Sequence, residues 1–141
     1  GGLHVLAAED NAVNAMVIQT ILKGKVETLT IVENGQEAVD AVNAGDFDVV
    51  LMDKQMPVMD GVEATRRIRA LSGPKASIPI VAVTADAFAA AREELLEAGA
   101  DDYLAKPIKP EDLKRAIAQN MRKNGEAGDS DHAPSLTARK A

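Results

Sequence analysis

The chain has 141 residues, 46% hydrophobic and 27% charged, a balance that predicts one soluble globular domain with a sizeable core. Its formal net charge of -6 argues against an extended nucleic-acid interface, because phosphate contacts require clustered lysine and arginine. Without cysteine the chain forms no disulfide, thiolate zinc site or thiol nucleophile. It contains no leader and no apolar run near the roughly 18 residues of a membrane span, so a cytoplasmic location is expected.

Short apolar runs alternate with amphipathic segments along the chain. Strands are predicted over residues 3–8, 26–32, 49–53, 78–83 and 101–105. Helices are predicted after residues 11, 35 and 61, and over residues 88–98 and 111–123. Connections of this length suit crossovers between parallel strands, so the expected fold class is α/β, a five-stranded parallel sheet with helices on both faces.

Two helical faces are predicted from residue spacing. In the first helix the apolar stripe is expected to be Val13, Met16, Val17, Thr20 and Ile21, with Asn11 as a possible cap. In the third, Arg66, Arg67 and Arg69 are expected to form a solvated face. Residues 3–123 are expected to make up the single domain, residues 1–2 a linker or cloning remnant, and residues 124–141 a disordered polar tail.

Polar side chains follow four of the predicted strands: Glu9 and Asp10 the first, Asp53 the third, Thr84 the fourth and Lys106 the fifth. Taken singly, each acid is as well explained by helix capping or a turn. The carboxyl ends of parallel strands share one edge, however, so these side chains are expected to meet. Clustered carboxylates suit Mg²⁺, and with a lysine and a hydroxyl they provide the groups needed to receive a phosphoryl group.

Four segments at these strand ends carry a resemblance to a known family. They are AEDN (8–11), LMDKQMPVMDG (51–61), VTA (83–85) and DDYLAKPI (101–108). In this order they resemble the receiver domain of two-component signalling, the family of the bacterial chemotaxis response regulator. The resemblance covers about residues 3–122 and implies the strand order 2-1-3-4-5.

The resemblance implies a role for each residue at the acidic end of the sheet. Asp53 corresponds to the phosphoacceptor. Asp10 and Asp53 correspond to direct ligands of Mg²⁺ (or Mn²⁺), with the main-chain carbonyl of Gln55 as a further ligand and Glu9 acting through water. These assignments come from the family and extend the prediction of an oxygen-only cation site.

The remaining roles concern the last two strands. Lys106 would pair with the acceptor carboxylate or a phosphoryl oxygen, and Thr84 would hydrogen-bond the phosphoryl group. Tyr103 corresponds to an aromatic switch residue, and the Lys106–Pro107 peptide is expected to be cis. Lys54 departs from the family, which often carries an apolar residue there, so an extra cation is expected at the rim of the site.

The expected function is acceptance of a phosphoryl group from a phosphohistidine on a histidine kinase dimerisation domain or a histidine phosphotransfer protein. The motifs most resemble receivers at the carboxyl ends of hybrid sensor histidine kinases, whose full-length chains are in some cases membrane-anchored. Having no glycine-rich phosphate loop, the fragment is not expected to use ATP itself. Three alternatives remain: a free-standing single-domain regulator, a non-phosphorylated docking module, and a haloacid-dehalogenase-like phosphatase, which would want an acid at Ala12 or Gln55.

Overall fold

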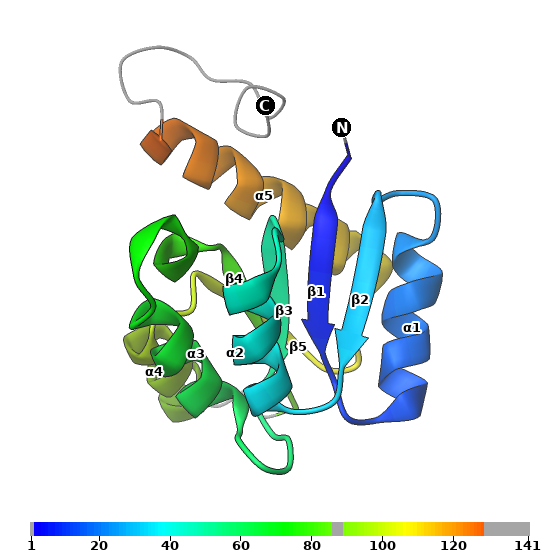
Figure 1. Cartoon of the computed structure of the whole chain (residues 1–141). Coiled ribbons are helices and arrows are strands. Elements are labelled where there is room, and N and C mark those ends of the chain that lie inside the picture. The colour runs from blue at the N-terminus through cyan, green and yellow to red at the C-terminus, as the bar shows by residue number, and fades with distance from the viewer. Residues whose placement is uncertain (1, 86–88, 129–141) are drawn as a thin grey trace.

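The computed structural model describes residues 2–85 and 89–128, in which strands and helices alternate (Figure 1). The strands are β1 (His4–Ala8), β2 (Thr28–Val32), β3 (Val49–Asp53), β4 (Ile80–Thr84) and β5 (Asp102–Ala105). The helices are α1 (Ala12–Leu22), α2 (Gly35–Ala44), α3 (Gly61–Arg69), the 3₁₀ helix η1 (Gly73–Ser77), α4 (Ala89–Ala98) and α5 (Pro110–Gly128). Among these residues every helix is too short or too polar to span a lipid bilayer.

Three element boundaries differ from the prediction by two residues or more. Strand β2 begins two residues later than expected, at Thr28. Strand β4 begins at Ile80, because η1 ends just before Ile78 and Pro79 has no N–H to donate to a strand ladder. Helix α5 continues to Gly128, into the segment predicted to be a tail. The rest of that tail, residues 129–141, and the predicted helix start at residue 88 lie outside the described residues.

The strands form one parallel sheet in the order β2-β1-β3-β4-β5, which confirms the expected topology. Because all five strands run the same way, their carboxyl ends lie along one edge, at the bottom of Figure 1. The central strand β3 is buried over its whole length, as expected for a strand covered on both faces.

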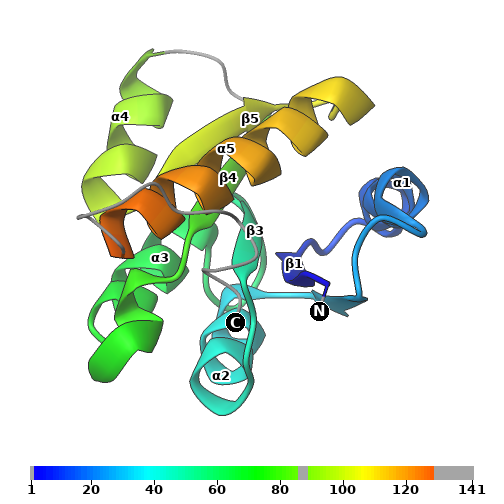
Figure 2. The same cartoon turned by 90° about the horizontal axis from the view of Figure 1, so that it is seen from above.

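Helices cover both faces of the sheet, and each face has its own aliphatic core (Figure 2). Helices α2, α3 and α4 pack on one face, against side chains such as Leu6, Met52 and Ile80. Helices α1 and α5 pack on the other, against Val5, Leu51 and Val81. Alternate residues of each strand therefore enter opposite cores, as the pleat of a strand requires.

The predicted inner face of α1 is confirmed at Ile21 and wrong at the other four residues, which are exposed. The side chains buried in this helix are Ile18, Ile21 and Leu22, whereas Val13 is 68% and Met16 is 62% exposed. The helix carries two apolar stripes at the same spacing, and only the one in its C-terminal half lies over the sheet. The cap is as predicted: the Asn11 side chain accepts hydrogen bonds from the first turn of α1. An unpartnered apolar surface is thus left at the start of α1.

The predicted solvated face of α3 is wrong at one residue. Arg66 and Arg67 are exposed, but the Arg69 side chain is only 22% exposed. It links α3 to η1 and to the loop between α4 and β5. Its guanidinium donates hydrogen bonds of 2.7–2.9 Å to the carbonyls of Gly99, Ala76 and Ile78 and to the carboxylate of Asp101. Arginine has five N–H donors on a long side chain. From the last turn of α3, Arg69 can therefore donate hydrogen bonds to several carbonyls of neighbouring segments.

We expect Gly61→Ala to destabilise the fold by about 2–4 kcal/mol, because a Cβ there would collide with main-chain atoms of Asp53 and Lys54. The matched control is Gly24→Ala. Gly24 has φ 76° but no atom within 4 Å of the added carbon, so its cost should be only the backbone strain, about 1 kcal/mol. Urea unfolding of the three proteins measures both costs. Equal losses would show that close packing at Gly61 is unimportant.

Candidate active site

Strand register brings the predicted residues together. Ala8 pairs with Met52, so Glu9 lies beside Asp53 at the edge of the sheet. On the other side of β3, Thr84 pairs with Ala105 and the main-chain N–H of Lys106 donates to the Thr84 carbonyl at 2.9 Å. The residues at the carboxyl ends of β1, β3, β4 and β5 therefore lie close together.

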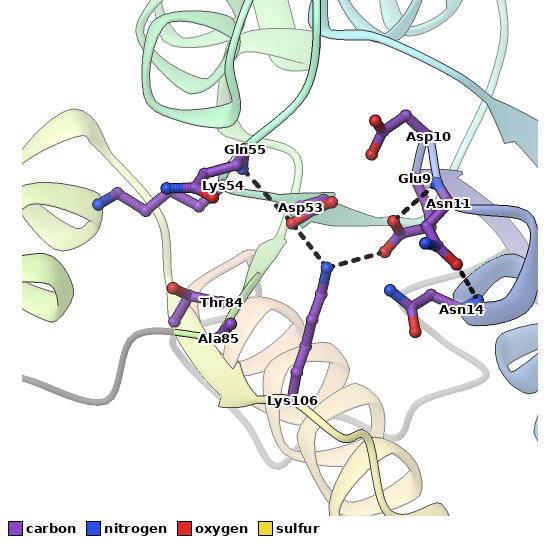
Figure 3. Close-up of a pocket in the computed structure, with 10 residues that line it drawn as sticks. All are labelled: Glu9, Asp10, Asn11, Asn14, Asp53, Lys54, Gln55, Thr84, Ala85 and Lys106. Atoms are coloured by element: carbon purple, nitrogen blue, oxygen red, sulfur yellow. Dashed lines mark hydrogen bonds and ion pairs between the residues drawn. The ribbon is translucent and has the colours of Figure 1, made fainter.

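These residues line a cleft of about 260 Å³ at the carboxyl edge of the sheet (Figure 3). All five strand-end residues predicted from the sequence contribute to it: Glu9, Asp10, Asp53, Thr84 and Lys106. Five more complete the lining: Asn11, Asn14, Lys54, Gln55 and Ala85. Asn11 and Asn14 were not predicted as site residues; their position in and before the first turn of α1, directly after the acidic pair, was the available signal. Tyr103 is not part of this lining.

Three carboxylates meet in the cleft. One oxygen each from Glu9, Asp10 and Asp53 lie within 4.8 Å of one another. Glu9 is 2% and Asp53 4% exposed, whereas Asp10 is open to solvent. The ammonium of Lys106 lies 3.1 Å from Asp53 Oδ1 and 3.4 Å from Glu9 Oε1, and these two contacts are drawn in Figure 3. One cation therefore bridges two buried acids.

The environment of Asp53 resists ionisation. Burial raises the pKa of Asp53 from its ordinary 3.8 to about 6; the neighbouring Glu9 carboxylate also raises it, and Lys106 opposes both. Lys106 thus compensates only part of the cost of holding two carboxylates together in a buried site. A second positive charge would favour the ionised form of Asp53.

The donor set suits a hard divalent cation. Glu9 Oε1 is buried and accepts no hydrogen bond from any described residue, although it forms an ion pair with Lys106 at 3.4 Å. The other Glu9 oxygen, Oε2, accepts from the main-chain N–H of Asn11 at 3.1 Å. Oxygen ligands in a partly open cleft match the preferences of Mg²⁺, which keeps several of its waters. The residues present therefore fit the expected metal.

The Lys106–Pro107 peptide bond and the side chain of Tyr103 lie in or just after β5. The Lys106–Pro107 peptide is cis, as predicted. Tyr103 is half-buried, and Arg92 of α4 contacts it twice: its Nη1 donates to the tyrosine hydroxyl at 2.6 Å, and its guanidinium lies 5.2 Å from the ring centroid. The predicted extra cation, Lys54, does lie at the rim, but its side chain runs away from Asp53 (Figure 3).

Comparison with known proteins identifies the family. The response regulator receiver domain family matches residues 5–118, so the chain belongs to that family. It is 45% identical over 116 residues to the sensor protein GacS of Pseudomonas syringae pv. syringae, covering 81% of this chain and 13% of the relative. It is also 45% identical over 121 residues to the two-component response regulator ORR41 of Oryza sativa subsp. japonica, covering 83% of this chain and 93% of that protein.

Solved structures agree with this assignment. The receiver domain of sensor histidine kinase PA1611 from Pseudomonas aeruginosa PAO1, with magnesium coordinated in its active site cleft, is 40% identical with a TM-score of 0.77, covering 85% of this chain and 98% of that one. The receiver domain of Ssk1 in complex with the histidine phosphotransfer protein Ypd1, from Saccharomyces cerevisiae, is 31% identical with a TM-score of 0.76, covering 84% and 88%. The chain is a receiver domain similar to those of hybrid histidine kinases.

Proposed function

We propose that this receiver accepts a phosphoryl group from a phosphohistidine onto the carboxylate of Asp53. The observation that carries the proposal is the position of that carboxylate, buried at a strand end between the ammonium of Lys106 and two further acids. One Asp53 oxygen forms the new P–O bond while the P–N bond to the imidazole breaks. The departing nitrogen keeps the bonding electrons and takes up a proton, so the partner histidine leaves neutral.

The residues around Asp53 have complementary roles in this proposal. Lys106 neutralises charge that builds on the phosphoryl oxygens, since phosphoryl transfer depends on positioning and charge compensation. The hydroxyl of Thr84, at the end of β4, donates a hydrogen bond to the bound phosphoryl group. Ala85 has the small side chain that an open approach to Asp53 requires.

Mg²⁺ is the proposed cofactor, with Mn²⁺ as a substitute. Asp10 and Asp53 would bind it directly, the main-chain carbonyl of Gln55 would be a third ligand, and Glu9 would act through water. When bound, the metal compensates negative charge on the acceptor and on the incoming phosphoryl oxygens. The buried Glu9 Oε1, which accepts no hydrogen bond from the described residues, supports this assignment, as does the magnesium in the cleft of the similar PA1611 receiver.

The proposed partner is a phosphohistidine-bearing domain, either the dimerisation domain of a histidine kinase or a histidine phosphotransfer protein. The exposed apolar residues Val13, Met16 and Val17 of α1 support it, because they adjoin Asn14 in the lining of the cleft. Val58, in the loop between β3 and α3, is a further exposed apolar residue, 82% exposed. The Ssk1 receiver in the related structure binds a partner of this kind, Ypd1.

The proposed context is the receiver of a hybrid sensor histidine kinase in the cytoplasm, with the domain spanning residues 3–123. The chain spans 13% of the length of GacS, which is consistent with one module of such a protein. A free-standing regulator is the alternative, and ORR41, of which this chain covers 93%, is a relative of about that size. In either context, Thr84 and Tyr103 are proposed to change position together when Asp53 is phosphorylated.

The test uses beryllofluoride, which stands in for a phosphoryl group on a carboxylate. Amide spectra are recorded for the wild type and Asp53→Asn before and after adding Mg²⁺ with beryllofluoride or acetyl phosphate. We expect large shifts around the cleft in the wild type and none in the variant. A wild type whose amide signals do not shift would contradict the proposal and favour the docking module. Steady phosphate release from varied small substrates would instead favour the phosphatase.

A further inference from the structure

Lys54 is attached to the acceptor loop by its main chain at two points. Its N–H donates to the Val83 carbonyl at 2.9 Å, and its own carbonyl accepts from the Gly61 N–H at 2.8 Å. The backbone beside Asp53 is therefore held on both sides. The side chain alone can change its direction without disturbing β3.

That side chain points at α4. The ammonium of Lys54 lies 3.3 Å from Glu94 Oε1, with the lysine side chain 18% and the glutamate 50% exposed. On this side Lys54 also lines a second, shallower depression of about 450 Å³ together with residues of α4: Ala90, Ala91, Glu93, Glu94 and Glu97. Lys54 thus borders both the acceptor cleft and the acidic surface of α4.

The present partner of Lys54 is a weak one. An ion pair with a half-exposed carboxylate contributes roughly 0–1 kcal/mol, because water screens it and two long side chains lose freedom. A phosphoryl group on the adjacent residue would carry roughly two negative charges and three acceptor oxygens inside a partly buried cleft. In that setting the charge attraction is stronger than at the exposed Glu94.

We propose that Lys54 is a second cation of the phosphoryl site, held by Glu94 until Asp53 is phosphorylated and then transferred to the phosphoryl oxygens. This inference rests on the proposed function and adds a phosphoryl-binding residue to it. The transfer breaks the contact between the loop after β3 and α4, so phosphorylation loosens α4 directly. Helix α4 is then held on its other side by the contact of Arg92 with Tyr103.

We expect opposite effects on beryllofluoride binding when Lys54 or Glu94 is replaced. Lys54→Met removes the cation, so beryllofluoride should bind about 3–10-fold more weakly, and the α4 amides of Leu95 and Ala98 should shift much less on binding. Glu94→Gln frees Lys54 beforehand, so binding should be about 2–5-fold tighter, and the α4 amides should already lie near their activated positions. The matched control is Glu97→Gln, which removes the same charge one turn further along α4 and should leave affinity and shifts unchanged.

The experiment is a beryllofluoride titration with Mg²⁺, followed by amide spectra, on the wild type and these three variants. A wild type that binds no beryllofluoride overturns the proposed function itself. A wild type that responds, with Lys54→Met matching it in affinity and in α4 shifts, overturns this inference and leaves the proposed function standing. Unchanged affinity in Glu94→Gln also overturns it, as does an equal gain in Glu97→Gln, which would indicate a general charge effect.

Discussion

Asp53→Asn is expected to stabilise the metal-free protein by about 2 kcal/mol near pH 7.5 while abolishing phosphoryl acceptance. The pKa of Asp53 rises from 3.8 to about 6 on folding, so the folded state holds its proton more tightly than the unfolded chain does. Stability therefore falls as the pH rises from about 4 to about 6, and the full cost is present above that window. Asparagine, which carries no charge, avoids this cost.

The check is urea unfolding with a chelator at about pH 7.5 and at about pH 4, where most of the difference in unfolding free energy between wild type and Asp53→Asn should be lost. Asp60→Asn is the matched control: it makes the same chemical change at the cap of α3, where asparagine and aspartate serve equally well. Saturating Mg²⁺ should stabilise the wild type more than Asp53→Asn and so narrow the gap. A gain of the same size at both pH values would contradict the electrostatic explanation.

Lys106→Met is expected to act in the opposite direction, with a loss of about 2–4 kcal/mol near pH 7.5. It removes the cation that lies 3.1 Å from Asp53 and 3.4 Å from Glu9, which leaves two buried carboxylates facing each other. The loss should shrink toward about pH 5 as Asp53 takes up a proton. Phosphoryl acceptance should fall by about 100-fold or more, as when a fixed charge-stabilising group is lost.

A double-variant cycle separates this electrostatic cost from lost packing. In the Asp53→Asn background one carboxylate is gone, so Lys106→Met should cost at least about 1 kcal/mol less than in the wild type. Lys109→Met, an exposed lysine just before α5, is the control and should change the free energy of unfolding by less than about 0.5 kcal/mol. Identical costs in both backgrounds would show that Lys106 acts through its packing alone.

The site was largely predictable because its residues share a simple topological property. Each predicted member, such as Glu9, Asp53 or Lys106, lies at or directly after the end of a strand, and parallel strands place those positions along one edge. Asn14 was missed as a lining residue because it belongs to a helix, and helix spacing does not indicate that the first turn overhangs the cleft.

The errors concern side chains whose surroundings are made by distant parts of the chain. Val13 and Ile18 are both apolar residues of the same helix, and only packing against the sheet decides which one is buried. Arg69 resembles Arg66 in sequence, but the carbonyl of Gly99, thirty positions away, completes its set of acceptors. The contact of Lys54 with Glu94 joins the loop after β3 to α4, and no local sequence pattern predicts it.

The amino-acid sequence by itself determined the order of strands and helices, the chemical groups at the strand ends and the family resemblance. Local apolar periodicity and turn residues carry that information, since they act over a few neighbouring positions. Only the tertiary structure decided the register that sets Glu9 beside Asp53, the burial that raises the pKa of Asp53, and the direction of Lys54. These properties depend on distance and desolvation, which arise when the helices close over the sheet.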